Sequence, residues 1–204
     1  MDNTNFWRTV PDLKNNANRS YFFKGKKELK ILIWSFQWAE GKTRLLHELK
    51  NINNKERIPF IPFARIYDLN EGEVNFNGIN MKFWDIGGLH MARKAFRNEY
   101  VPQSDVMIYL IDSSMKYDND QNLIVYNESC FEDFRECIRL IGDKPVLIVI
   151  TKIDMRQTGT LDIIEAYHLE NLYERKQKFG IIECSSVTLE GVKEILFWLS
   201  SIIN

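Results

Sequence analysis

Two uninterrupted apolar runs constrain the fold of this chain more than any other feature of its sequence. They are VMIYLI, at positions 106–111, and VLIVI, at positions 146–150. Each is far shorter than the roughly 18 residues of a membrane-spanning helix, and a continuous apolar run of this length is typical of a strand buried on both faces. From Leu29 onward, short apolar segments alternate with helix-length amphipathic ones. This order predicts an α/β fold, a mostly parallel sheet with helices on both faces.

The predicted sheet has six strands, near residues 29–36, 62–70, 74–85, 105–111, 145–151 and 180–184. Asn77-Gly78 is a turn signal between strand-like runs, because both residue types tolerate positive φ. We therefore expect the second and third strands to pair antiparallel, so that one strand runs against the others. The last helical segment places Val192, Ile195 and Leu196 at helical spacing, and we expect this face to pack on the core.

The composition is that of one globular domain. The chain has 204 residues, of which 45 % are hydrophobic and 27 % charged, enough to bury one sizeable core. We expect residues 21–204 to form this domain and the Asn-rich residues 1–20 to be an extension, either disordered or a short helix. A net charge of -1 gives no overall attraction to nucleic acid. Three cysteines without a C-x-x-C pair indicate free thiols in a reducing, cytoplasmic interior.

The segment WSFQWAEGKTR, positions 34–44, contains half of a phosphate-binding loop of the form G-x-x-x-x-G-K-[ST]. Its Gly41, Lys42 and Thr43 follow a predicted strand and open a helical segment, whose N-terminal dipole favours an anion. The first glycine of the motif is replaced by Phe36, a bulky residue where the backbone must approach phosphate closely. By itself the half-motif is a weak signal.

Three further motifs follow in the chain, each after a predicted strand. WDIGG places Asp85 and Gly88 in a D-x-x-G pattern, where the carboxylate can hold Mg²⁺ through water and the glycine amide can reach a γ-phosphate. TKID places Lys152 and Asp154 where the carboxylate can accept two N–H bonds from a guanine edge and the lysine stem can cover the base. ECSS, at positions 183–186, can offer backbone N–H groups to that base. Four motifs in this order predict a nucleotide site at the carboxyl ends of the strands.

In these motifs the chain resembles the Ras superfamily of small GTPases and, within it, the Arf family. The resemblance spans roughly residues 22–202, and the Trp before Asp85 and the double Gly after it are Arf-type features. The long segment FARIYDLNEGEVNFNGINMKFWD is also similar to bacterial Mgl-type GTPases. The resemblance implies a P-loop small-GTPase fold, GTP or GDP with Mg²⁺ as cofactors, and protein effectors and regulators as partners.

The resemblance also assigns site residues. The residues it implies for nucleotide binding are Ala39, Gly41, Lys42, Thr43, Arg44, Gly88, Thr151, Lys152, Asp154, Cys184, Ser185 and Ser186. Thr43 and Asp85 are the implied Mg²⁺ ligands. Thr151 stands where Asn is usual, but Rac-type GTPases are similar in using Thr there. The implied effector surface is an aromatic cluster of Phe63, Trp84 and Tyr100, although Trp84 could equally be a buried core residue.

Three departures from the family pattern bear on hydrolysis. Leu89 replaces the Gln that orients the attacking water, and a Leu side chain can neither donate nor accept a hydrogen bond. Phe60 stands in the place of the switch Thr that contacts Mg²⁺ and the γ-phosphate, and Trp38 replaces a small residue near that phosphate. We therefore assign no residue a catalytic role and expect intrinsic hydrolysis to be very slow or absent.

Two functions remain open at this point. In the first, the chain is a long-lived guanine-nucleotide switch that signals through effectors. In the second, it is a pseudo-GTPase scaffold that binds a partner independently of nucleotide, as Phe36 suggests. Neither myristoylation nor prenylation is expected, because Asp2 follows Met1 and the chain ends in SSIIN. Peripheral membrane contact therefore has no support from a lipidation motif.

Overall fold

The computed structural model describes residues 26–36, 40–52, 54, 56–61, 69–87, 93–115, 128–172 and 178–203. Its strands are β1 (Glu28–Ser35), β2 (Leu69–Phe76), β3 (Ile79–Ile86), β4 (Val106–Asp112), β5 (Val146–Thr151) and β6 (Phe179–Glu183). Its helices are α1 (Lys42–Asn51), α2 (Arg93–Gln103), α3 (Glu128–Ile141), α4 (Thr160–Ala166) and α5 (Val192–Ser201), with short 3₁₀ turns at Ile153–Met155 and Leu169–Leu172. The predicted extension at residues 1–20 lies outside the described residues.

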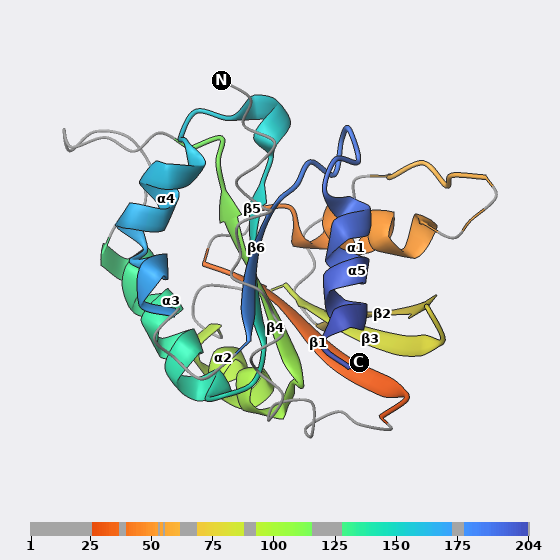
Figure 1. Ribbon diagram of the computed structural model, residues 1–204, viewed down its shortest axis with the longest axis horizontal. Coiled ribbons are helices and arrows are strands. Elements are labelled where there is room, and N and C mark those ends of the chain that lie inside the picture. Colours follow the sequence, from red (N-terminus) through yellow and green to blue (C-terminus); the bar gives the residue numbers. More distant parts are fainter. Residues whose placement is uncertain are drawn as a thin grey trace.

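The described strands form one six-stranded sheet in the order β2-β3-β1-β4-β5-β6. Neighbouring strands are parallel except β2 and β3, which pair antiparallel. Helices α1 and α5 cover one face of the sheet, and α2, α3 and α4 cover the other (Figure 1). The structure thus confirms the predicted α/β fold, with a mostly parallel sheet, one antiparallel strand and helices on both faces.

The hairpin of β2 and β3 corrects the predicted strand boundaries. A single third strand at 74–85 is wrong, because Asn77 and Gly78 interrupt it with φ values of 52° and 77°. The strand-like residues on the two sides of this turn belong to different strands, and the second strand extends through Phe76. Residues 62–68 of the predicted second strand lie outside the described residues. The antiparallel pairing expected from the Asn-Gly turn is confirmed.

The central strands are buried on both faces, as their continuous apolar sequences predict. Every residue of β4 and β5 is buried, whereas buried and exposed residues alternate along the edge strand β2. On β1, Ile31 and Ile33 join the core beneath α1 and α5, and Leu32 and Trp34 join the core beneath α3, because successive side chains of a strand point to opposite faces. Within the described part of the chain, no helix is long and apolar enough to cross a membrane.

Candidate nucleotide site

The predicted motifs meet at one edge of the sheet. Strands β3, β1, β4, β5 and β6 run in the same direction, so the residues that follow them gather at their carboxyl ends. Lys42 and Thr43 open α1 after β1, Asp85 lies near the end of β3, and Thr151 ends β5. Five residues singled out from the sequence for this site lie outside the described residues: Trp38, Ala39, Phe63, Gly88 and Leu89.

Gly41 sets the start of α1. It is the N-cap residue of the helix, with φ at 94° in the left-handed region, and its carbonyl accepts a 2.8 Å hydrogen bond from the Leu45 amide. A side chain at this φ costs about 1–2 kcal/mol. The first turn of α1 contains no acidic residue, so its free N–H groups and positive dipole end remain suited to an anion.

Lys42 is a buried cation at this helix start. Only 7 % of the residue is exposed, and its Nζ donates a 2.7 Å hydrogen bond to Ser35 Oγ. Burial lowers the pKa of Lys42 from its ordinary value of 10.5, and the nearby carboxylates of Glu40 and Asp85 only partly oppose this effect. Burial disfavours the charged form of this ammonium group, and the negative charge of a bound phosphate would stabilise that form.

Thr43 and Asp85 form the pair expected to hold Mg²⁺. Thr43 Oγ1 donates a 2.7 Å hydrogen bond to Asp85 Oδ2, and the Asp85 side chain is fully buried. Asp85 Oδ1 is also buried and has no hydrogen-bond partner among the described residues. A buried carboxylate oxygen without a donor is unfavourable unless a cation satisfies it. A hydroxyl beside such a carboxylate is an oxygen ligand set of the kind that Mg²⁺ prefers, so these residues fit the ion.

Asn70 is a member of this group that the sequence analysis missed. It lies directly opposite Asp85 in the β2–β3 pair, and its Nδ2 donates a 3.3 Å hydrogen bond to Asp85 Oδ2. Counting outward from the Asn77-Gly78 turn would have placed these two residues opposite each other. The amide therefore holds the same carboxylate oxygen as Thr43, which leaves Oδ1 as the oxygen available to a cation.

The TKID segment contacts the phosphate loop as well as the predicted base site. Thr151 Oγ1 lies 3.1 Å from the Glu40 carbonyl oxygen, so the end of β5 is tied to the loop that precedes Lys42. Lys152 has φ at 57° and pairs through Nζ with Asp112 Oδ2 at 2.5 Å. The pair fixes the lysine stem beside the carboxyl end of β4. The contact of Thr151 with the loop is a role that the nucleotide-binding assignment did not anticipate.

Asp154 and Ser185 form the other half of the predicted base site. Asp154 is exposed, and its Oδ1 accepts a 2.6 Å hydrogen bond from Ser185 Oγ. The amides of Cys184 and Ser185 already donate to Ile150 and Glu190. This leaves the Ser186 amide as the donor of this segment that could meet a base. Burial raises the pKa of the Cys184 thiol to about 12, so Cys184 is a neutral core residue whose contribution to the site is structural.

Gly191 holds the loop that carries these serines against β6. Its φ is 76°, and an added Cβ would lie 1.9 Å from the Glu183 carbonyl oxygen. Gly191→Ala should lower the free energy of unfolding by about 3 kcal/mol, from left-handed strain and the steric clash together. Gly142→Ala is the matched control, because Gly142 has φ at 65° with no described atom within 4 Å of an added Cβ. Urea unfolding compares the two, and equal losses would contradict the close approach.

Phe36 and Arg44 adopt positions that the motif alone did not indicate. Phe36 is half-buried, packs against the core beneath α3, and has the Arg93 guanidinium 5.0 Å from its ring centroid. The Arg44 guanidinium lies 5.4 Å from the ring centroid of Phe60. The Phe36 side chain therefore has a packed place on the α2–α3 face of the sheet.

The described part of the aromatic cluster is mostly covered. Trp84 is only 8 % exposed, and its Nε1 donates to Glu71 Oε1 at 3.1 Å. The Tyr100 ring packs edge-on against the Trp84 ring, with 5.6 Å between the ring centroids, and Lys30 Nζ lies 5.7 Å from the Trp84 ring centroid. A partner at this surface would meet Tyr100 and Lys30 before the indole. The effector role of Trp84 and Tyr100 stays a prediction.

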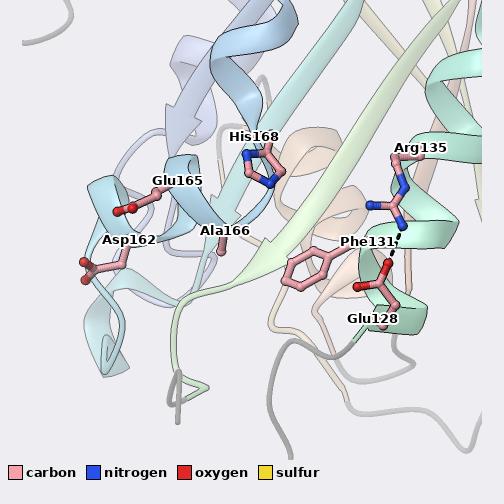
Figure 2. Close-up of a pocket in the computed structure, with 7 residues that line it drawn as sticks. All are labelled: Glu128, Phe131, Arg135, Asp162, Glu165, Ala166 and His168. Atoms are coloured by element: carbon pink, nitrogen blue, oxygen red, sulfur yellow. Dashed lines mark hydrogen bonds and ion pairs between the residues drawn. The ribbon is translucent and has the colours of Figure 1, made fainter. Parts of the chain in front are cut away.

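A separate hollow of about 510 Å³ lies between α3 and α4 (Figure 2). The residues that line it are Glu128, Phe131, Arg135, Asp162, Glu165, Ala166 and His168. Glu128 and Arg135 pair along α3, and Phe131 lies between the two helices (Figure 2). The hollow shares no residue with the candidate nucleotide site.

Comparisons with known proteins agree with this geometry. The sequence model of the ADP-ribosylation factor family matches residues 16–203. The chain is 26 % identical over 195 residues to ADP-ribosylation factor J of Dictyostelium discoideum, covering 92 % of each chain. It is 32 % identical over 191 residues to ADP-ribosylation factor-like protein 1 of Drosophila melanogaster, covering 91 % of this chain and 96 % of the relative. It is 33 % identical over 183 residues to ADP-ribosylation factor 3 of Arabidopsis thaliana, covering 88 % and 91 %. The chain therefore belongs to the ADP-ribosylation factor family, within the Ras superfamily of small GTPases.

Proposed function

We propose that this chain is a guanine-nucleotide switch of the Arf type that binds GTP or GDP with Mg²⁺ and hydrolyses GTP very slowly. The observation that carries the proposal is the group of Thr43, Asp85 and Asn70, in which the buried Asp85 Oδ1 has no hydrogen-bond partner among the described residues. A cation satisfies that oxygen, and the buried ammonium of Lys42 next to it suits the phosphates. The domain assignment of residues 21–204 is part of this proposal.

Each described residue has a definite task in this proposal. The first-turn amides of α1 and the Lys42 ammonium bind and orient the phosphates. Thr43 and Asp85 hold Mg²⁺, which when bound neutralises phosphate charge. Asp154 accepts the N–H groups of guanine, with its position set by the Ser185 hydroxyl. Thr151 keeps the phosphate loop in register with the base site through the Glu40 carbonyl.

Slow hydrolysis follows from what the sequence lacks. Leu89 cannot orient a water molecule, and Phe60 has no oxygen to offer to Mg²⁺. A chain of this kind would stay in its triphosphate state until another protein acts on it. We propose that effectors and regulators meet the surface around Tyr100, and that the protein works in the cytoplasm, where its three buried cysteines remain free thiols.

The scaffold alternative rested on Phe36 filling the space that phosphate needs. The packing of Phe36 against the core beneath α3 weakens that objection, and it supports the switch. The remaining argument for a scaffold is that Lys42 and Thr43 already have partners within the protein, in Ser35 and Asp85. A nucleotide would have to compete with those hydrogen bonds.

The nucleotide content of the purified protein tests the proposal directly. Freshly purified protein is denatured, and released nucleotide is identified and quantified by ion-exchange chromatography. We expect near-stoichiometric GTP, because binding is retained and hydrolysis is slow. Near-stoichiometric GDP would support binding but contradict slow hydrolysis. An empty protein whose melting temperature ignores added GTP, GDP and Mg²⁺ would favour the scaffold.

A further inference from the structure

Arg93 rests on two aromatic rings at the end of β1. Its guanidinium carbon lies 5.0 Å from the Phe36 ring centroid and 5.4 Å from the Trp34 ring centroid. These distances fall within the roughly 6 Å range of a cation–π contact. Phe36 occupies the position at which the phosphate-loop motif has its first glycine. The residue that breaks the motif is therefore the residue that holds this arginine.

Arg93 has no counter-ion among the described residues. Its Nε is buried there without a hydrogen-bond partner. Arg97, one turn further along α2, differs because its guanidinium donates a 2.7 Å hydrogen bond to Asp133 Oδ1. A cation–π contact is weaker than a charge-assisted hydrogen bond to phosphate. The Arg93 guanidinium is thus held in place and still able to bind an anion.

Arg93 and Lys42 approach the end of β1 from opposite faces of the sheet. Lys42 Nζ bonds Ser35 Oγ, whereas Arg93 contacts the residues on either side of Ser35, and alternate side chains of a strand point to opposite faces. Two cations at the same strand end repel each other, and an anion at the carboxyl end of β1 would relieve that repulsion.

We propose that Phe36, which stands in place of the first glycine of the loop, positions Arg93 through its ring. The guanidinium held there is a second cation for the terminal phosphate of a bound nucleoside triphosphate. The inference rests on the proposed nucleotide-binding function. The terminal phosphate is the target because α2 begins shortly after the D-x-x-G motif in the chain, and in the proposed function that motif is expected to meet this phosphate. Arg93 would then stabilise the charge of the terminal phosphate from α2, in a chain that lacks the switch Thr and the Gln of the family.

Equilibrium titration with fluorescent GDP and a non-hydrolysable GTP analogue, in Mg²⁺, tests this role through binding alone. Arg93→Ala should lower the affinity for the GTP analogue about tenfold and that for GDP less than about threefold. Phe36→Leu keeps an apolar side chain but removes the ring face, so it too should lower the affinity for the GTP analogue more than the affinity for GDP. The double variant should be no worse than Arg93→Ala, because both changes remove one interaction. Lys94→Ala, at an exposed neighbour on α2, is the matched control.

The outcomes separate this inference from the proposed function. A wild-type protein that binds neither nucleotide would overturn the proposed function and the inference with it. A wild-type protein that binds both, with Arg93→Ala unchanged, would overturn the inference alone. The same holds if Arg93→Ala weakens GDP and the GTP analogue equally and also lowers the melting temperature of the nucleotide-free protein, since Arg93 would then be structural.

Discussion

Lys42→Met is expected to lower the affinity for both GTP and GDP by about a hundredfold to a thousandfold. The residue opens α1 with its ammonium buried beside Ser35, where it would face the phosphates. Two unit charges about 4 Å apart near a protein surface interact by about 4 kcal/mol, which corresponds to roughly a thousandfold in affinity. Methionine keeps most of the side-chain volume, so the change removes charge with little loss of packing. Titration with a fluorescent guanine nucleotide measures the effect.

Lys50→Met is the matched control for this change. Lys50 lies in the last turn of the same helix and is exposed, far along α1 from Gly41. It should leave nucleotide affinity unchanged. Equal affinities for wild type and Lys42→Met, with binding retained in both, would show that Lys42 does not contact phosphate.

The nucleotide-free protein gives Lys42 a second signature. Burial lowers the pKa of Lys42 below 10.5 in the folded state, so the folded protein loses this proton at lower pH than the unfolded chain does. Between the lowered pKa and 10.5 the unfolded chain binds more protons, and the contribution of Lys42 to stability therefore rises with pH. Lys42→Met should abolish this rise in urea unfolding across alkaline pH, and Lys50→Met should retain it.

Much of the fold could be predicted because it rests on local patterns. The continuous apolar sequences of β4 and β5 required strands buried on both faces, and the Asn77-Gly78 turn required an antiparallel neighbour. Parallel strands in turn bring their carboxyl ends together, so Thr43 and Asp85 could be expected to meet although 42 positions separate them. The turn signal did not show where the flanking strands begin and end. The incorrect strand boundaries that we predicted hid the pairing of Asn70 with Asp85.

The remaining contacts of the site depend on packing that no local pattern encodes. The ECSS motif predicted that the Ser185 amide could donate to a base, but in the structure this amide donates to the Glu190 carbonyl oxygen within the same loop. Phe36 was interpreted as an obstruction because a motif specifies residue types and not side-chain directions. Its ring turns toward Arg93 on α2, a residue that carried no motif. Such pairings become visible only when α2 and α3 are placed on the sheet.

Asp133 is the residue that joins these elements. Its Oδ2 accepts a 2.9 Å hydrogen bond from Trp34 Nε1 on β1, and its Oδ1 accepts one from Arg97 on α2. The Tyr109 hydroxyl on β4 lies 3.4 Å from Oδ2. Burial is the largest cause that raises the pKa of Tyr109 well above its ordinary value, so this hydroxyl stays protonated and remains a donor. One buried carboxylate on α3 thus satisfies donors from three other elements beneath the phosphate loop.

Asp133→Ala is therefore expected to lower the free energy of unfolding by about 3–5 kcal/mol, because it leaves the largely buried charge of Arg97 without its partner. Trp34 Nε1 also loses its acceptor, which adds to the cost. Urea unfolding of the nucleotide-free protein measures the loss. Glu136→Gln on the same helix is the control: Glu136 pairs with Arg139 at the solvent-exposed side of α3, where such pairs add little. Similar small losses for the two variants would mean that Asp133 does not hold α2 and β1 together. A large loss for Asp133→Ala alone would show that this carboxylate connects α2 to the strand that leads into the phosphate loop.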